Sequence, residues 1–150
     1  MVSLVRTDAS HSEFEILVNK LDEGLKVTDG DEHEFYHQFN GIENIKYVVI
    51  AFDEDQAVGC GAIKHFGEKI MEVKRMFVIE NARGKGIASN ILAELEKWTR
   101  ELNYSTCILE TGINQPEAVG LYRKSSYQKI ENYGQYKDAS NSHCFEKVLF

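Results

Sequence analysis

Apolar residues recur at two different spacings along this chain, and each spacing predicts one kind of element. Over residues 12–25 they stand three or four positions apart, which indicates an amphipathic helix that Ser10 or Ser12 could cap. A longer stripe predicts a helix of about four turns that begins near Gly84. Its members are Ile87, Ile91, Leu92, Leu95, Trp98 and Leu102. Two shorter helices are expected over 31–40 and 117–124.

Runs of apolar and β-branched residues between these helices predict strands. Three runs cover 47–53, 57–66 and 69–79, and the short turn segments EDQ and GE that join them favour antiparallel hairpins. A short apolar start at 2–5 and later runs over 105–110, 127–133 and 143–150 complete the pattern. An antiparallel meander that feeds a β-α-β crossover predicts an α/β protein with a mixed sheet and helices on its faces.

Composition narrows the class of protein. The 150 residues are 43% hydrophobic and 27% charged, with a single proline and no linker or repeat, so we expect one domain over residues 1–150. A formal net charge of −7 argues against a nucleic-acid-binding protein, which normally carries a basic surplus. No apolar run reaches the ~18 to 20 residues of a membrane-spanning helix. The first residues also lack a secretory signal, so we expect no membrane contact and a cytoplasmic location.

The cysteines and histidines favour neither disulfides nor a metal site. Cys60, Cys107 and Cys144 are odd in number and lie far apart, which predicts reduced thiols packed in apolar surroundings rather than nucleophiles. The histidines show no HxxH or HExxH spacing, so no metal is expected.

The segment over residues 72–98 carries the most chemical information. A strand ends there, a polar turn follows, and Gly84 and Gly86 open the long amphipathic helix. Unpaired amides and the helix dipole at such a junction bind anions, and glycines let a diphosphate approach the backbone. Arg83 and Lys85 add mobile positive charge to an otherwise acidic chain.

Other interpretations of the two glycines differ in strength. A tight strand-to-helix turn would explain them equally well and stays open. A Walker loop is excluded because GxxxxGK[ST] is absent, and Ser89 stands where the third glycine of a GxGxxG dinucleotide motif would be.

Two motifs together point to a known family. The hexapeptide Arg83-Gly84-Lys85-Gly86-Ile87-Ala88 matches the signature [QR]xxGx[GA] and follows the strand KRMFV. The segment NQPEAVGLYRKSSY, over residues 114–127, is similar to an N…A…LYxKxGF segment, with Ser126 in place of the usual glycine. With the order of elements, these motifs resemble the GNAT superfamily of acetyl-CoA-dependent N-acetyltransferases over nearly the whole chain. The resemblance implies a central mixed, mostly antiparallel sheet with helices on both faces and a splayed, V-shaped cleft.

The same resemblance implies where acetyl-CoA binds as the cosubstrate. A β-bulge should splay the strand over 69–79 from its neighbour and leave pantetheine in the gap, with a backbone N–H near Met76 bonded to the thioester carbonyl. Asn114 either contacts the cofactor or caps the following helix. The expected cofactor-binding residues besides Asn114 are Met76, Phe77 and Val78 along the pantetheine arm, and Arg83, Gly84, Lys85, Gly86, Ile87 and Ala88 at the diphosphate.

Two residues are implied as catalytic. Tyr122 matches the tyrosine that many members place near the CoA sulfur, where a phenol can protonate the departing thiolate; the alternative is a partly buried aromatic on an amphipathic helix. Glu72 matches a strand glutamate that serves as general base in the histone acetyltransferase branch; the alternative is a solvated strand carboxylate or one paired with Lys74 or Arg75. A water chain to backbone carbonyls could also accept the proton.

The acceptor substrate is the part of the reaction that the sequence determines least. The resemblance implies acetyl transfer to a primary amine by direct attack in a ternary complex, and a catalytically silent CoA-binding or sensory module on the same fold is the alternative. Acidic residues would attract a cationic acceptor, and Tyr133 and Tyr136 lie in a segment that borders the acceptor cleft in relatives. Small amines, polyamines, peptides and protein N-termini all stay open, as does a homodimer. The acidic residues are Asp29, Asp31, Glu32 and Glu34.

Overall fold

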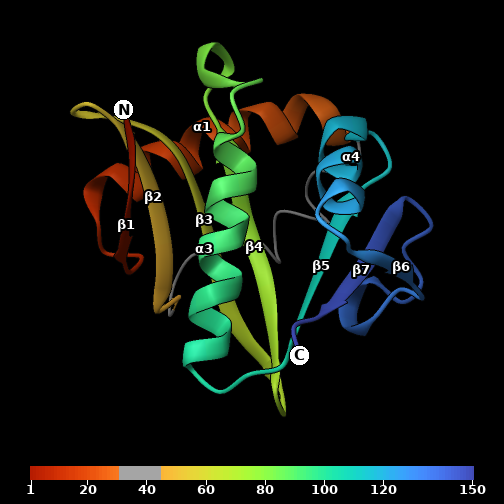
Figure 1. Ribbon diagram of the computed structural model, residues 1–150. Helices are drawn as coiled ribbons and strands as arrows, with labels where there is room; N and C mark the ends of the chain where they lie inside the picture. The colour runs from red at the N-terminus through yellow and green to blue at the C-terminus, as the bar shows by residue number, and fades with distance from the viewer. Residues whose placement is uncertain (31–44) are drawn as a thin grey trace.

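A seven-stranded mixed sheet forms the centre of the protein, in the strand order β1-β2-β3-β4-β5-β7-β6 (Figure 1). This is a computed structural model, and it describes residues 1–30 and 45–150. Every neighbouring pair is antiparallel except β4 with β5, which is parallel. The strands are β1 (Val2–Thr7), β2 (Tyr47–Asp53), β3 (Gln56–Gly67), β4 (Ile70–Val78), β5 (Thr106–Gly112), β6 (Gln128–Ile130) and β7 (Ser142–Val148).

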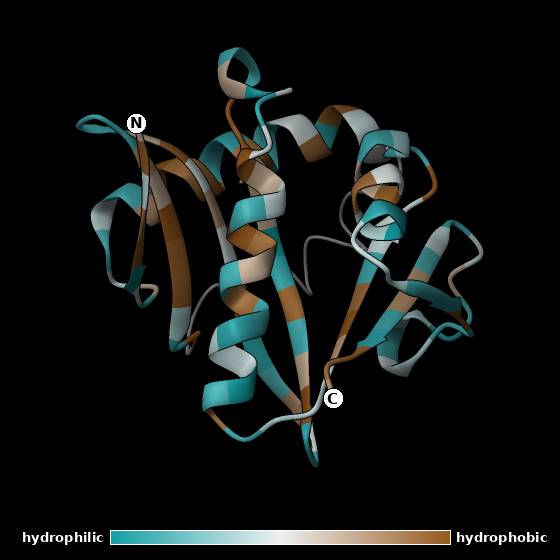
Figure 2. Ribbon diagram, in the orientation of Figure 1, coloured by the Kyte–Doolittle hydropathy of each residue, from teal (hydrophilic) through white to brown (hydrophobic). Residues whose placement is uncertain are grey.

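Helices cover both faces of this sheet. In Figure 1, α3 crosses in front of the strands while α1 runs behind them. The ribbon of α3 alternates hydrophobic and hydrophilic bands in Figure 2, as expected for a helix with one face against a sheet. The helices are α1 (Ser12–Asp29), α3 (Ile87–Glu101) and α4 (Pro116–Lys124), with short 3₁₀ turns η2 (Glu80–Ala82) and η3 (Gly134–Tyr136). The mixed sheet with helices on both faces is therefore confirmed.

Several predicted boundaries needed correction. Helix α1 continues to Asp29, and its cap is His11, whose Nδ1 accepts from the Glu13 amide at 3.1 Å, not Ser10 or Ser12. The strand predicted over 127–133 is shorter, because the chain turns into η3 after Ile130. The helix predicted over 31–40 lies outside the described residues.

The split between β4 and β5 creates the feature that matters for function. The two strands pair only from Ile70–Thr106 to Glu72–Ile108. Beyond Glu72, the β3–β4 register shifts between Cys60 and Ala62, which is a β-bulge, and Arg75 adopts the left-handed region with φ +58°. The bulged strand diverges from β5, so the predicted bulge and V-shaped gap are confirmed.

Candidate active site

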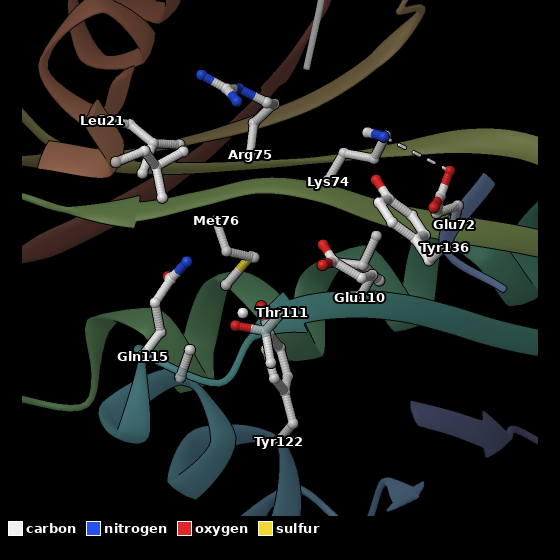
Figure 3. Close-up of a pocket in the computed structure, with 14 residues that line it drawn as sticks. Leu21, Glu72, Lys74, Arg75, Met76, Glu110, Thr111, Gln115, Tyr122 and Tyr136 are labelled. Atoms are coloured by element: carbon white, nitrogen blue, oxygen red, sulfur yellow. Dashed lines mark ion pairs between the residues drawn. The ribbon is translucent and has the colours of Figure 1, made fainter. Parts of the chain in front are cut away.

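Two adjoining hollows occupy the gap between β4 and β5. The large groove, of about 490 Å³, runs between the end of β4, the start of α3, α1 and α4. The small cavity, of about 100 Å³, lies toward the base of the gap and is drawn in Figure 3. The two hollows share part of their lining, so molecules bound in them would lie next to each other. The shared lining residues are Leu21, Leu25, Met76, Gln115, Ala118 and Tyr122.

The large groove collects most of the residues expected to bind the cofactor. Seven of the ten line it: Met76, Phe77, Val78, Arg83, Ile87, Ala88 and Asn114. Gly84, Lys85 and Gly86 are not among its lining residues and lie beside it in the loop that leads into α3. The structure thus brings the set to one place, and the role of each member stays a prediction.

The start of α3 has the geometry of an anion cradle. Gly84 and Gly86 both have φ +79°, and a Cβ built on either would meet no atom within 4 Å. The first helical bond runs from the Asn90 amide to the Gly86 carbonyl at 3.0 Å, and no side chain of the described residues caps the helix at Gly86. The amides of the first turn therefore have no partner within the helix and face open space, which suits a phosphate.

Arg83 is exposed and makes two contacts at the end of β4. Its Nε donates to the Val78 carbonyl at 2.9 Å, and its guanidinium carbon lies 5.8 Å from the centre of the Phe77 ring. This anchoring ties the loop to the end of β4 and holds the guanidinium over the groove. Lys85 is exposed.

Asn114 lines the groove and does not cap α4. The N-cap position belongs to Gln115, whose side chain makes no capping hydrogen bond. Asn114 instead donates from its Nδ2 to the carbonyl of Thr28 in α1, at 3.5 Å, across the large groove. Of the two roles considered for Asn114, the cap is therefore wrong and the cofactor contact stays a prediction.

Tyr122 lies where the groove and the cavity meet. Its side chain is only 6% exposed, and its ring packs against Tyr127 at 5.8 Å and Phe145 at 6.3 Å between centroids. Burial, with a smaller contribution from the charge of Glu110, raises the pKa of the Tyr122 phenol well above its ordinary value. The phenol therefore keeps its proton throughout the working pH range, as a proton donor requires.

Glu72 stands at the fork where β4 leaves β5. It is 6% exposed, which excludes a solvated carboxylate. Its Oε1 lies 3.7 Å from the Lys74 Nζ, and its Oε2 accepts a 2.6 Å hydrogen bond from the Tyr133 hydroxyl. Pairing with Lys74 was anticipated, whereas Arg75 pairs elsewhere. Figure 3 shows Glu72 and Lys74 toward one end of the small cavity and Tyr122 toward the other.

Lys74, Glu110 and Tyr136 line this cavity beside Glu72. The sequence predicted Lys74 as a partner of Glu72 and placed Tyr136 near the acceptor, but it did not reveal Glu110. Lys74 follows Glu72 by two positions and so shares its face of the strand. Glu110 is on β5 and accepts from the Ser142 hydroxyl at 2.6 Å, a contact that no local pattern reveals. Burial lowers the pKa of Lys74, and the charges of Glu72 and Glu110 oppose that shift.

Arg75 connects the bulge to α1, the helix that covers the gap. Its side chain is 2% exposed and pairs with Asp22. Among the residues that the structure describes, the buried Arg75 Nε has no hydrogen-bond partner, and Asp22 is the acidic side chain that pairs with the guanidinium. This pair holds the wall formed by Leu21 and Leu25 over both hollows.

Replacing Asp22 by alanine should lower the free energy of unfolding by about 3 kcal/mol, because a buried guanidinium would lose its counter-ion. Asp55→Ala, in an exposed turn, is the matched control and should change it by less than ~0.5 kcal/mol. Urea denaturation of the two variants measures the difference. Equal stabilities would show that the pair contributes nothing to the fold.

The remaining reactive groups do not converge on the gap. All three cysteines are buried, and burial raises the pKa of Cys60 to about 12 and that of Cys144 to about 11. Within residues 1–30 and 45–150, no three metal-ligating side chains gather. In the same ranges, none of the helices combines the length and apolar character needed to traverse a bilayer.

The sequence model of the acetyltransferase (GNAT) family matches residues 14–127 of the chain, a range that includes the lining residues of the large groove and the glycine loop. The chain belongs to the GNAT acetyltransferase family. An IAA acetyltransferase from Azospirillum brasilense is 37% identical over 102 residues, which is 67% of each chain.

Solved structures agree with this assignment. A Klebsiella pneumoniae protein assigned as an acyl-CoA N-acyltransferase superposes with a TM-score of 0.85 at 27% identity, over 100% of this chain and 99% of its own. The fold also matches the PaiA N-acetyltransferase of Thermoplasma acidophilum in complex with coenzyme A, with a TM-score of 0.74 at 16% identity over 99% of both chains. This GNAT protein is an acetyl-CoA-dependent acyltransferase.

Proposed function

We propose that this GNAT acetyltransferase transfers acetyl from acetyl-CoA to a primary amine, by direct attack of the amine while both substrates are bound. The observation that carries the proposal is the junction of the two hollows at Met76 and Tyr122. The groove of about 490 Å³ meets a small cavity lined by charged side chains at that point. Two substrates bound in this way can react without a covalent intermediate on the protein.

The groove would hold acetyl-CoA, which supplies an activated acetyl thioester. The amides at the start of α3 would bind the diphosphate, with Arg83 close by. The pairing of β4 with β5 ends at Glu72, and in the described part of the chain no other strand pairs with β4 on that side, so the backbone of 76–78 would be available to pair with pantetheine. That edge would also place a backbone N–H near Met76 toward the thioester carbonyl.

Tyr122 would act as the proton donor to the departing thiolate. Its phenol lines both hollows, so it can reach the reacting atoms from the side of α4. Its raised pKa keeps it protonated. Its packing against Tyr127 and Phe145 is also the packing expected of a structural aromatic, and the two roles are compatible because only the hydroxyl is needed for catalysis.

Glu72 would receive the proton from the acceptor, directly or through a water molecule. An amine must be neutral to attack, and a buried carboxylate beside the acceptor cavity both attracts its ammonium form and removes its proton. Glu110 adds a second carboxylate to the same cavity, which favours a cationic acceptor. Asp31, Glu32 and Glu34, and the side chain of Asp29, lie outside what the structure describes.

Replacing Glu72 by glutamine should lower kcat/KM about 100-fold, because an amide keeps the shape of the side chain but cannot accept a proton. The dissociation constant for acetyl-CoA should stay unchanged, since Glu72 does not line the large groove. Steady-state kinetics and calorimetric titration measure the two quantities.

The pH dependence of kcat/KM provides the control for this prediction. A base gives wild type a rising acidic limb, but deprotonation of the substrate ammonium gives a similar one. The profile is therefore recorded with two amines of different pKa. A limb that moves fully with the amine, together with an active Glu72→Gln enzyme, would leave water and backbone as the proton acceptors.

A turnover screen tests the proposed function itself. Purified protein and acetyl-CoA are incubated with a library of small amines, polyamines and peptides, and free CoA thiol is measured together with the N-acetyl product. The name of the Azospirillum relative, an IAA acetyltransferase, favours small molecules as the first group to screen. Thiol release that depends on an amine supports the proposal. Tight binding of acetyl-CoA without turnover of any amine would support a silent CoA-binding module instead.

A further inference from the structure

Tyr133 makes the shortest contact to the proposed base. It immediately precedes η3 and lies far along the chain from Glu72, yet its hydroxyl donates a 2.6 Å hydrogen bond to the Glu72 Oε2. The other carboxylate oxygen, Oε1, is on the side of Lys74. One oxygen of Glu72 is therefore held by a phenol, and the opposite oxygen has the weaker of the two contacts.

Aromatic contacts hold the Tyr133 ring in place. Phe66, at the end of β3, packs edge-on against it with 5.1 Å between centroids, and Tyr136 does so from the other side at 5.8 Å. The Asn132 Nδ2 donates to the Ala139 carbonyl at 2.9 Å, which fixes the loop that carries Tyr133. Burial, followed by the charge of Glu72, raises the pKa of the Tyr133 phenol, so it remains a donor.

We propose that Tyr133 is a positioning residue for acetyl transfer, whose hydroxyl clamps one oxygen of Glu72 so that the other is presented to the acceptor amine. This inference rests on the proposed role of Glu72 as the base. A carboxylate can otherwise rotate about its last side-chain bond and point its lone pairs in several directions. A base is efficient only where the accepting oxygen is already aligned with the proton it removes.

Other charged and titratable groups also face Glu72, from every element around it. Lys74 is on the same strand, and Lys64 of β3 is the cross-strand partner of Glu72. Tyr136, Glu110 and Cys144 approach from η3, β5 and β7, and each of these elements contributes to the surroundings of the carboxylate. Tyr133 differs from these groups because its hydroxyl donates a short, directional hydrogen bond to the carboxylate.

Replacing Tyr133 by phenylalanine tests the inference, because the ring and its contacts with Phe66 and Tyr136 are kept. We expect kcat/KM to fall about tenfold, since the carboxylate loses the hydrogen bond that aligns it. The dissociation constant for acetyl-CoA should stay close to that of wild type. Tyr127→Phe is the matched control, since it also removes a buried phenol hydroxyl, whereas the hydroxyl that donates to Glu72 is that of Tyr133.

A double-mutant cycle separates positioning from general structural damage. In the Glu72→Gln background, Tyr133→Phe should have no further effect on kcat/KM, because there is no carboxylate left to orient. Phe66→Leu, at a partly exposed position, should produce a smaller change in the same direction by loosening the Tyr133 ring.

The outcomes distinguish this inference from the proposal on which it rests. A fully active Glu72→Gln enzyme would overturn the assignment of the base and this inference with it. An impaired Glu72→Gln enzyme beside an unaltered Tyr133→Phe enzyme would overturn the inference alone. If Tyr133→Phe lowered kcat/KM by the same factor in wild type and in the Glu72→Gln background, the inference would also be overturned, because Tyr133 would then act without Glu72.

Discussion

Replacing Gly86 by glutamate should weaken acetyl-CoA binding by at least about 100-fold, because a like charge at an anion site costs several kcal/mol and each 1.4 kcal/mol is a factor of ten. Gly86 is the N-cap of α3, where the first-turn amides face open space. A Cβ built on Gly86 meets no atom within 4 Å, so we expect a longer side chain to project into the space proposed for the diphosphate. Calorimetric titration with acetyl-CoA measures the effect.

Gly86→Gln separates charge from backbone strain. Gly86 has φ +79°, a region that costs most other residues about 1–2 kcal/mol, and glutamine carries the same strain and nearly the same shape as glutamate without its charge. The glutamine variant should therefore bind acetyl-CoA much better than the glutamate variant. Equal affinities of both variants and wild type would remove this loop from the cofactor site.

Replacing Tyr122 by phenylalanine should lower kcat by about tenfold to a thousandfold, because the departing thiolate would lose its proton donor. The ring contacts with Tyr127 and Phe145 survive the substitution, so the fold and the dissociation constant for acetyl-CoA should change little. Steady-state and binding measurements on one preparation separate the two effects. Equal kcat values would return Tyr122 to a purely structural role.

The pH profile of wild type provides a second check on Tyr122. Its pKa is raised, so its proton is retained as pH rises through the ordinary tyrosine range near 10. Deprotonation of Tyr122 should therefore not lower kcat at alkaline pH values up to about 10. If kcat of wild type fell at a pH well below about 10, and this fall were absent in Tyr122→Phe, the raised pKa of Tyr122 would be contradicted.

Local patterns were sufficient to predict the strands, α3 and the glycine loop. Each depends on residues close in sequence: the apolar stripe of α3 buries Ile91 and Leu95, and the two glycines take up the positive φ that their loop requires. The turn at Ser126 is also set locally. It replaces the glycine typical of the family, yet it adopts φ +74°, so the turn after α4 keeps its left-handed conformation with serine.

The missed features depend on contacts between distant segments. The hydrogen bond from Tyr133 to Glu72 joins positions 61 residues apart, and the pair of Arg75 with Asp22 spans 53. The fork between β4 and β5 brings Glu110 beside Glu72, and that depends on a strand register that single-strand periodicity does not reveal. The cap by His11 was missed because serine is the commoner capping residue.

Initial-rate kinetics with both substrates varied provide the most direct test of acetyl transfer within a ternary complex. An acceptor from the turnover screen is varied at several fixed concentrations of acetyl-CoA, and reciprocal rates are plotted against reciprocal acceptor concentration. The junction of groove and cavity at Tyr122 and the burial of all three cysteines predict intersecting lines. Parallel lines, with acetyl retained on the protein when acetyl-CoA is supplied alone, would show a covalent intermediate and contradict direct attack.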